Sequence, residues 1–402
     1  MILVAFLLLA GGLSACGGPG LFHAAPPADV YEDATPTGYG QIRFWADATP
    51  DNIEALLQQR TALLKRRFAD TIAAGKPIEM NFLALSGGGQ NGAFGAGLLS
   101  GWTQNGTRPE FEVVTGISTG ALIAPFAFLG PEWDDKLQEV YTSLTTDSIL
   151  NLAILKGLTG GLALTDVAPF RRTIEKYATE EMFQLIAAEH RKGRRLYVGT
   201  SALDAARPVV WDIGAIANSG VPGSLELFHD IVQASASIPG AFPPVLIEVE
   251  VDGKQYSELH ADGGVTTQVF AYPAQIDFND IDKLLPTGFD RSVYVIRNAT
   301  VRPPYENVRP RLLPLLRRSI SVLIAYQGIG DLYRISANAE RDGIDFNLVS
   351  IPESWDMEYE EAFDQKYMTA LFALGERVGR DGIPWRDRVL AADPEAEIAV
   401  MN

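Results

Sequence analysis

The sequence contains little cysteine and histidine, and it has fewer basic than acidic residues. Its single cysteine, Cys16, has no partner for an internal disulfide. The sequence contains no cysteine cluster and no H-E-x-x-H motif, so neither a metal nor an organic cofactor is implied. The 33 Lys and Arg against 50 Asp and Glu give a formal net charge of −17 at pH 7. Such a surface repels nucleic acid, and contact with anionic lipid needs an anchor or a local apolar patch.

The longest early apolar run, residues 2–10, is too short to span a bilayer comfortably. It leads to Leu13-Ser14-Ala15-Cys16, which resembles the lipobox of bacterial lipoprotein signal peptides. We therefore predict a signal peptide over 1–15, a lipid anchor on Cys16 and attachment to the cell envelope. No Lys or Arg precedes the run, so the natural start is expected upstream. The alternative is an ordinary secretory signal with a chance cysteine. Gly17, where an acidic residue could signal inner-membrane retention, favours the outer membrane.

Composition divides the rest of the chain into four parts. Residues 16–50 are rich in Gly, Pro, Ala and Thr and are predicted to form a flexible tether, and residues 51–76 have the spacing of an amphipathic lead-in helix. From 77 to 352, short apolar strands alternate with helices, which predicts an α/β three-layer sandwich with a mainly parallel central sheet. Residues 353–402 are predicted to be a C-terminal helical extension. No repeat of solenoid length is present.

Individual elements follow from the same periodicities. Strands are expected at 81–85, 112–115, 196–203, 292–298 and 346–351, with a hairpin over 249–257. Helices are expected at 92–102, 120–128, 225–236, 312–339 and 362–378.

A glycine loop follows the first of these strands, at Gly87-Gly88-Gly89. Uncovered amide groups at the start of a helix can converge on one anionic oxygen, as in an oxyanion hole. The same residues could form a plain strand-to-helix turn. Gly87, Gly89 and Gly92 also satisfy G-x-G-x-x-G, but the dinucleotide pattern needs an acidic residue at the end of the next strand, and Glu112 begins that strand instead.

The next strand ends in Gly116-Ile117-Ser118-Thr119-Gly120, a G-x-S-x-G sequence between a strand and a helix. In such a nucleophile elbow, flanking glycines Gly116 and Gly120 permit a sharp turn that exposes the serine hydroxyl. Ser118 is therefore the candidate nucleophile, with a helix-capping serine as the alternative. A serine nucleophile needs a base, and the sequence has only four histidines. Of these, only His260 lies beside a further motif, Asp262-Gly263-Gly264.

These motifs, in this order, resemble those of the patatin-like phospholipases. The segment 234–244, A-S-A-S-I-P-G-A-F-P-P, is similar to a family segment that precedes the aspartate. The resemblance implies a nucleophile at Ser118, a catalytic aspartate at Asp262 without a histidine, and oxyanion donors at the amides of Gly87, Gly88 and Gly89. A departure is Asn91, where the family often has Arg or Lys.

The resemblance implies a serine acyl hydrolase that cleaves lipid esters, with a membrane lipid as the favoured substrate. Two alternatives remain: an α/β-hydrolase esterase with His260 as base, and a non-catalytic envelope lipoprotein. In the α/β-hydrolase order the histidine comes after the last strand, whereas 142 residues follow His260. Residues 131–164 and 273–285 are candidate lids or interfacial surfaces.

Overall fold

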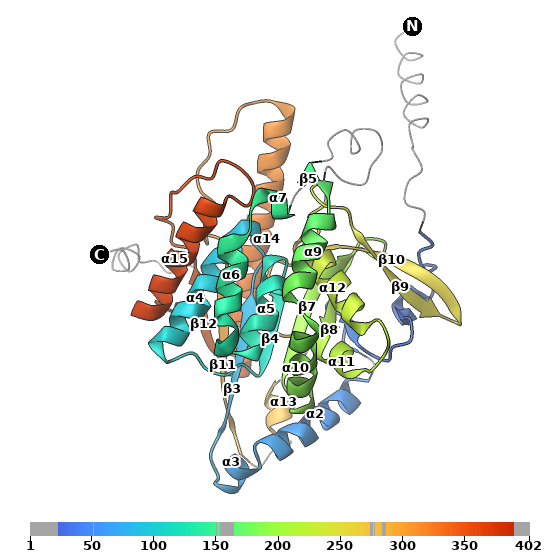
Figure 1. The fold of residues 1–402 in the computed structure, drawn as a ribbon. Coiled ribbons are helices and arrows are strands. Elements are labelled where there is room, and N and C mark those ends of the chain that lie inside the picture. The colour runs from blue at the N-terminus through green and yellow to red at the C-terminus, as the bar shows by residue number, and fades with distance from the viewer. Residues whose placement is uncertain are drawn as a thin grey trace.

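A computed structural model describes residues 23–389, apart from 51, 150, 153–164, 274–275, 277 and 284–286. The predicted signal peptide and the anchor residue Cys16 lie outside these residues. The described chain forms layers of helices on both faces of one large sheet (Figure 1), which confirms the α/β class. None of its described helices has both the length and the apolar character needed to cross a bilayer.

The central sheet has ten strands and is mixed. Its order is β1-β9-β10-β7-β4-β3-β11-β12, with β8 also paired to β7 and β2 paired to β8. The strands from β7 to β12 in this order run parallel, whereas every other pair is antiparallel. The bounds are β1 Thr35–Pro36, β2 Arg43–Trp45, β3 Ile78–Leu85, β4 Val113–Ile117, β7 Arg195–Ala202, β8 Arg207–Asp212, β9 Val245–Val251, β10 Lys254–Asp262, β11 Phe289–Arg297 and β12 Asp345–Ser350. A separate small pair joins β5 Asn151–Leu152 to β6 Thr165–Asp166.

Side chains point alternately to the two faces of the sheet along each strand, so each face has its own buried core. In β3, Leu83 and Leu85 join one buried cluster, while Phe82 and Ala84 join the other. The larger cluster includes side chains from α4 Gly92–Asn105, α5 Thr119–Leu129, α6 Asp134–Ser143, α9 Ala168–Tyr177, α10 Glu180–Arg191, α11 Ile213–Asn218, α12 Ser224–Ser235 and α15 Gln365–Asp381. The smaller one includes side chains from α2 Ile53–Arg67, α13 Phe278–Asp282 and α14 Leu312–Asp342. The remaining α-helices in the described residues are the short α3 Ala69–Ala73 and α7 Thr146–Ile149.

Part of the predicted tether is folded, which corrects the expectation of a flexible segment up to residue 50. Strands β1 and β2 pair with β9 and β8 at the antiparallel end of the sheet. Arg43 is buried there and donates hydrogen bonds to Glu258 and to the Ala34 carbonyl. Strands of two and three residues are too short to show a periodicity, so the sequence pattern missed them.

The C-terminal helix is integral to the sandwich and is no appended extension. Helix α15 packs on α4 through facing glycines, so the two backbones approach closely. A Cβ atom on Gly97 would lie 2.0 Å from the Phe372 carbonyl oxygen, and one on Gly375 would lie 2.2 Å from that of Phe94. The domain predicted to end at 352 therefore includes α15.

Candidate active site

Ser118 occupies a sharp turn between β4 and α5. Its backbone has φ 54° and ψ −122°, a conformation that side-chain-bearing residues rarely adopt and that often marks functional sites. The flanking glycines permit this turn: a Cβ on Gly116 would lie 2.3 Å from the Gly120 carbonyl oxygen, and one on Gly120 would lie 2.3 Å from the Leu85 carbonyl oxygen. The geometry is that of the strand-turn-helix elbow predicted from the sequence.

A buried serine on α12 supports the elbow from the side. The Ser118 N–H donates to Ser235 Oγ at 3.0 Å, and Ser235 Oγ donates to the Gly199 carbonyl at 2.7 Å. Ser235 is 0% exposed, so this link is shielded from water. Ser235 belongs to the 234–244 segment, whose role could not be derived from the residues alone.

The glycine loop lies against the serine. A Cβ on Gly87 would lie 3.4 Å from Ser118 Cβ, so the loop backbone at Gly87 packs against the Ser118 side chain. The Gly87 N–H, however, donates to the Gln268 carbonyl at 3.0 Å. This corrects one expectation, because an amide already bonded to protein is not free for an oxyanion. The amides of Gly88 and Gly89 donate to no acceptor in the described part of the chain.

Asn298, at the end of β11, holds this loop in place. Its side-chain amide donates to the Ser86 carbonyl at 2.9 Å and its Oδ1 accepts from the Gly95 N–H at 3.1 Å. The close approach requires glycine at position 88, since a Cβ there would lie 2.2 Å from the Asn298 carbonyl oxygen. Sequence reasoning placed Asn298 at a strand end without a role, and only the spatial adjacency of β11 and β3 reveals it.

Asp262 ends β10 and lies beside the serine. Its N–H donates to the Ser237 carbonyl at 3.0 Å, and its Oδ1 accepts from the Gly264 N–H at 2.7 Å. Burial raises the pKa of the Asp262 carboxyl to about 7, although hydrogen bonds from Gly264 and from the Ser118 hydroxyl oppose that rise. A carboxyl with this pKa can exchange a proton near neutral pH.

His260 is close in sequence to Asp262 but is bonded elsewhere. Its Nδ1 lies 2.9 Å from Thr200 Oγ1 and its Nε2 lies 3.0 Å from a Glu258 carboxylate oxygen. It is 0% exposed, and burial lowers the pKa of its imidazole. With both ring nitrogens occupied, His260 is not available as a base for Ser118, which counts against the α/β-hydrolase alternative.

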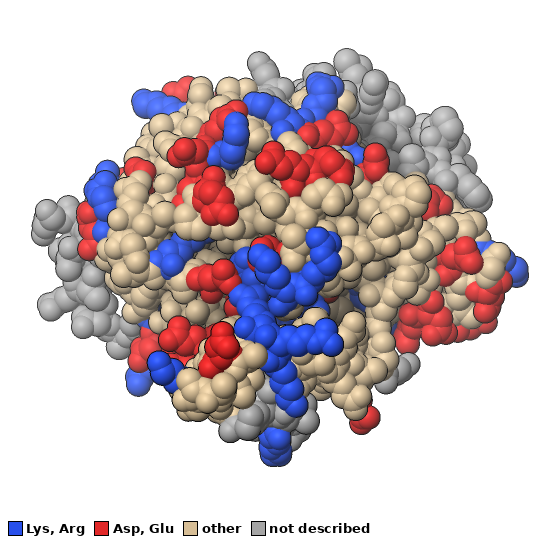
Figure 2. Space-filling view, turned by 60° about the horizontal axis from the view of Figure 1, so that its bottom comes forward, with Lys and Arg blue, Asp and Glu red and all other residues tan. Residues whose placement is uncertain are grey.

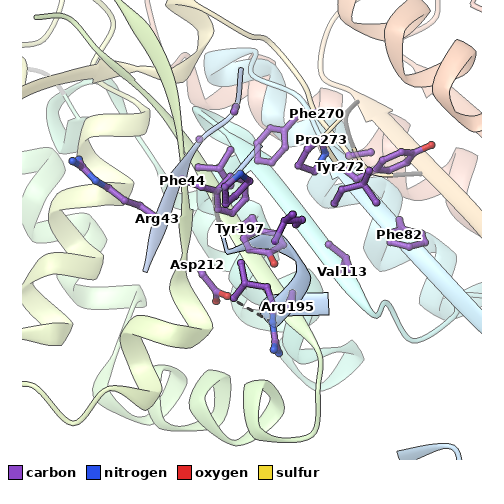
Figure 3. A pocket seen from close by; sticks show the side chains of 18 of the residues that line it. Arg43, Phe44, Phe82, Val113, Arg195, Tyr197, Asp212, Phe270, Tyr272 and Pro273 are labelled. Atoms are coloured by element: carbon purple, nitrogen blue, oxygen red, sulfur yellow. Dashed lines mark ion pairs between the residues drawn. The ribbon is translucent and has the colours of Figure 1, made fainter. Parts of the chain in front are cut away.

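A sizeable cavity lies apart from this site. A cavity of about 710 Å³ lies between α2, the sheet and α14, and its lining includes Phe44, Phe82 and Tyr197 but neither Ser118 nor Asp262 (Figure 3). Residues 117, 199 and 263, which adjoin the site, line part of the cavity wall. No group of carboxylate, histidine or cysteine side chains suited to a metal occurs among the described residues.

Positively charged side chains cluster at the amino ends of the parallel strands, at the other end of the sheet from Ser118. Figure 2 shows Lys and Arg grouped on the face that comes forward below the molecule. A hollow there is lined by Arg66, Arg67, Arg191 and Lys192, with acidic Glu110 and Glu189. Several of these are paired, as Arg67 is with Glu110 and Lys192 with Glu189. The basic hollow therefore has no part in the Ser118 site, which lies at the carboxyl ends of β3 and β4.

A layered α/β fold with a serine elbow, a glycine loop and a buried carboxyl defines the class of this protein. The family model described as patatin-like phospholipase matches residues 83–274, which contain all three features, so this part of the chain is similar to the patatin-like phospholipases. Among solved structures, the crystal structure of VipD from Legionella pneumophila is similar at 11% identity and a TM-score of 0.32, over 76% of this chain and 67% of that one. The comparison with curated proteins finds no match.

Proposed function

We propose that this domain is a serine acyl hydrolase that cleaves lipid ester bonds through Ser118 and Asp262. The observation that carries the proposal is the contact between the Ser118 hydroxyl, held out on a strained elbow, and a buried carboxyl with a pKa near neutrality. The similarity to patatin-like phospholipases supports lipid esters as the substrate class.

In the proposed reaction, Ser118 Oγ attacks the ester carbonyl while its proton passes to the Asp262 carboxylate. The carbonyl oxygen becomes an oxyanion, which the free amides of Gly88 and Gly89 would stabilise at the start of α4. The alcohol leaves with the proton from Asp262, and a water molecule activated by the same carboxylate then releases the acid. Gly87 contributes by packing against the serine, with its own amide engaged by Gln268.

Hydrolysis of a short-chain nitrophenyl ester and labelling by a fluorophosphonate probe test this proposal. We expect Ser118→Ala to abolish both, and Asp262→Asn to reduce turnover by at least about 10³-fold, since a general base and its orientation are lost together. His260→Gln serves as the matched control, because it alters a buried polar neighbour of the site and should leave turnover within a few-fold. Full activity in Asp262→Asn, or its loss only in His260→Gln, would refute the dyad.

We also propose that the chain is a lipoprotein of the cell envelope, anchored through Cys16 and attached to the outer membrane. The support is the sequence before Cys16. In cells fed an alkyne fatty acid, the wild-type chain should acquire the label, whereas Cys16→Ser should not. Equal labelling of both would rule out this anchor.

A further inference from the structure

The amino-terminal half of α14 and the segment before it expose a large apolar surface. We call residues 302–326 the α14 arm. Of the fifteen exposed large apolar side chains in the described chain, nine lie in the arm, and Leu312 and Leu313 are 72% and 76% exposed. Figure 1 shows the first turns of α14, in orange, standing clear of the neighbouring helices. Water-exposed apolar surface on this scale marks an interaction site in a soluble domain.

The arm is amphipathic and basic. Leu312, Leu316 and Ile320 recur every four residues and therefore share one face of the helix, while Arg318 and Ser321, three residues apart, share another. The arm contains five arginines and one acidic residue, Glu306, in a chain whose net charge is −17. This combination of exposed leucine and isoleucine with flanking arginine is typical of helices that lie in the interface of an anionic bilayer.

The arm adjoins the candidate active site. Gln327 directly follows the arm and donates to the Val265 carbonyl at 3.3 Å, and Asp331, one turn further along α14, accepts from the Gln268 N–H at 2.6 Å. Two further exposed apolar side chains, Ile238 and Val265, lie in the segments that flank Asp262. The apolar surface therefore extends from the arm to the loops around the site.

The start of the described chain lies at the same end of the sheet. His23 is bonded to Asp204 at 3.0 Å, two residues beyond the carboxyl end of β7. Cys16 precedes His23 by seven residues, a span of at most about 25 Å. A lipid on Cys16 would thus hold the arm and the site near the membrane surface.

We propose that the α14 arm is a membrane-docking surface that inserts its leucine and isoleucine face into an anionic bilayer and presents the Ser118 site to it. The arginines would pair with lipid phosphates while their aliphatic stems stay in the interface. Docking itself does not depend on hydrolysis; only the presentation of substrate rests on the proposed function. The candidate lids expected at 131–164 and 273–285 are not needed for this contact.

Vesicle binding tests the proposal with the full chain carrying Cys16→Ser and Ser118→Ala, so that neither an attached lipid nor turnover contributes. We expect sedimentation with phosphatidylglycerol-containing vesicles, weaker binding to pure phosphatidylcholine, and a partition coefficient lowered at least tenfold by Leu312→Asp with Leu316→Asp. Leu185→Asp is the matched control, because Leu185 is an exposed leucine, 41% accessible, on α10. It should leave binding unchanged.

Three outcomes would overturn this proposal. They are no vesicle binding by the parent chain, equal binding after the two arm substitutions, or a parent dimer that these substitutions convert to a monomer, which would make the arm a contact between copies. Hydrolysis of a soluble short-chain ester by a chain with Ser118 intact separates the two proposals. Absence of that activity refutes the hydrolase while leaving docking to stand on the vesicle result.

A second inference comes from the cavity on the other side of the sheet. Its wall is largely apolar, and five arginines line it: Arg43, Arg60, Arg195, Arg291 and Arg334. Four of them have a carboxylate within 4.0 Å, and Arg60 alone, among the described residues, has none. Burial also lowers the pKa of the Arg60 guanidinium, although the acidic groups of Tyr197, Glu112 and Asp212 partly oppose that shift.

We infer that this cavity binds a single-chain amphiphile with a carboxylate head, such as a long-chain fatty acid. The carboxylate would pair with Arg60, and the acyl chain would lie along aromatic side chains such as Phe44, Phe82 and Phe289. The volume of about 710 Å³ is within the range of small-ligand sites. The charge on Arg60 and the apolar wall together select an acid over a neutral lipid.

Calorimetric titration of the Ser118→Ala chain with oleate, below its aggregation concentration, tests this site. We expect saturable binding that Arg60→Gln weakens at least tenfold, with no such loss for oleyl alcohol. Arg66→Gln, an exposed arginine on the same helix, is the matched control. Absence of saturable oleate binding, or equal binding by Arg60→Gln, would reject the inference.

Discussion

At the scale of single residues, the buried carboxyl of Asp262 controls the pH dependence expected of the site. As a base, Asp262 must be ionised, and burial raises its pKa to about 7. The kcat/KM for a soluble ester should therefore fall tenfold per pH unit below about 7 and level off above it. A pH profile between 5 and 9 in the free enzyme measures this. An inflection near the ordinary aspartate value would show that the carboxyl is not desolvated.

The same burial opposes stability. A carboxyl whose pKa is higher in the folded than in the unfolded state favours folding at low pH, and this contribution disappears as pH rises through about 7. Above that pH, the buried charge costs on the order of a few kcal/mol. Asp262→Asn should therefore raise the unfolding temperature at pH 8 relative to the wild type, and by less at pH 5, as calorimetry can measure. A variant destabilised at pH 8 would contradict this.

Asn298 is a positioning residue for the glycine loop, since it acts through Ser86 and Gly95 without reaching the serine. Asn298→Ala should lower kcat about 10- to 100-fold with little change in KM, because the loop amides stabilise the oxyanion and not the bound ester. Asn298→Asp keeps the acceptor for Gly95 and should recover part of the loss. A rise in KM without a fall in kcat would instead indicate a role in binding.

At the scale of elements, the glycine contact between α4 and α15 is a sensitive point of the fold. Gly97→Ala would place a methyl group 2.0 Å from the Phe372 carbonyl oxygen, so one helix must move. We expect a loss of about 3 kcal/mol or more in urea unfolding. Gly330→Ala is the control: it lies inside α14 with open space around it and should stabilise by about 0.5–1 kcal/mol. Similar effects of both substitutions would contradict the packing argument.

The elements best predicted from sequence are those with a strong local signal. The hairpin over β9 and β10 was found from its Asp252-Gly253 turn, and both residues have positive φ, as this turn type requires. Strands β1 and β2 were missed because strands of two and three residues leave no period of their own, and β8 was missed because its buried residues are consecutive and do not alternate.

In the candidate site too, residues with a local sequence signal were predicted and residues that depend on distant partners were missed. The glycine loop, Ser118 and Asp262 each occupy a turn whose backbone constrains the residue type, so motifs identified them. Ser235 and Asn298 act through side-chain bonds to backbone atoms more than a hundred positions away, and no local pattern encodes such a partner. The engagement of the Gly87 amide by Gln268 likewise depends on the tertiary fold.

At the scale of the whole molecule, a buried charged cluster connects the folded N-terminal segment to the sheet. Glu258 accepts from Arg43 and His260, and these contacts hold the pKa of its carboxyl at about 2 despite the opposing effect of burial. Stability from a lowered carboxyl pKa is present above the unfolded value near 4.5 and is lost as pH falls towards 2. His260, whose imidazole pKa is also lowered, adds a loss that begins below its ordinary value of 6.5.

Replacing Arg43 tests whether this cluster holds the N-terminal segment. Arg43→Met leaves Glu258 buried beside a single partner and should cost about 3–5 kcal/mol in urea unfolding at pH 7. Its stability should also fall less than that of the wild type between pH 4.5 and 2, because the Glu258 pKa moves back towards its ordinary value. Arg207→Met, which removes pairs with the exposed Asp47 and Glu32 in the same region, should cost less than about 1 kcal/mol. Equal costs for the two variants would mean that the buried pair contributes no more than a surface pair, and the strands at β1 and β2 would then owe their attachment to their pairing with β9 and β8 and to apolar packing.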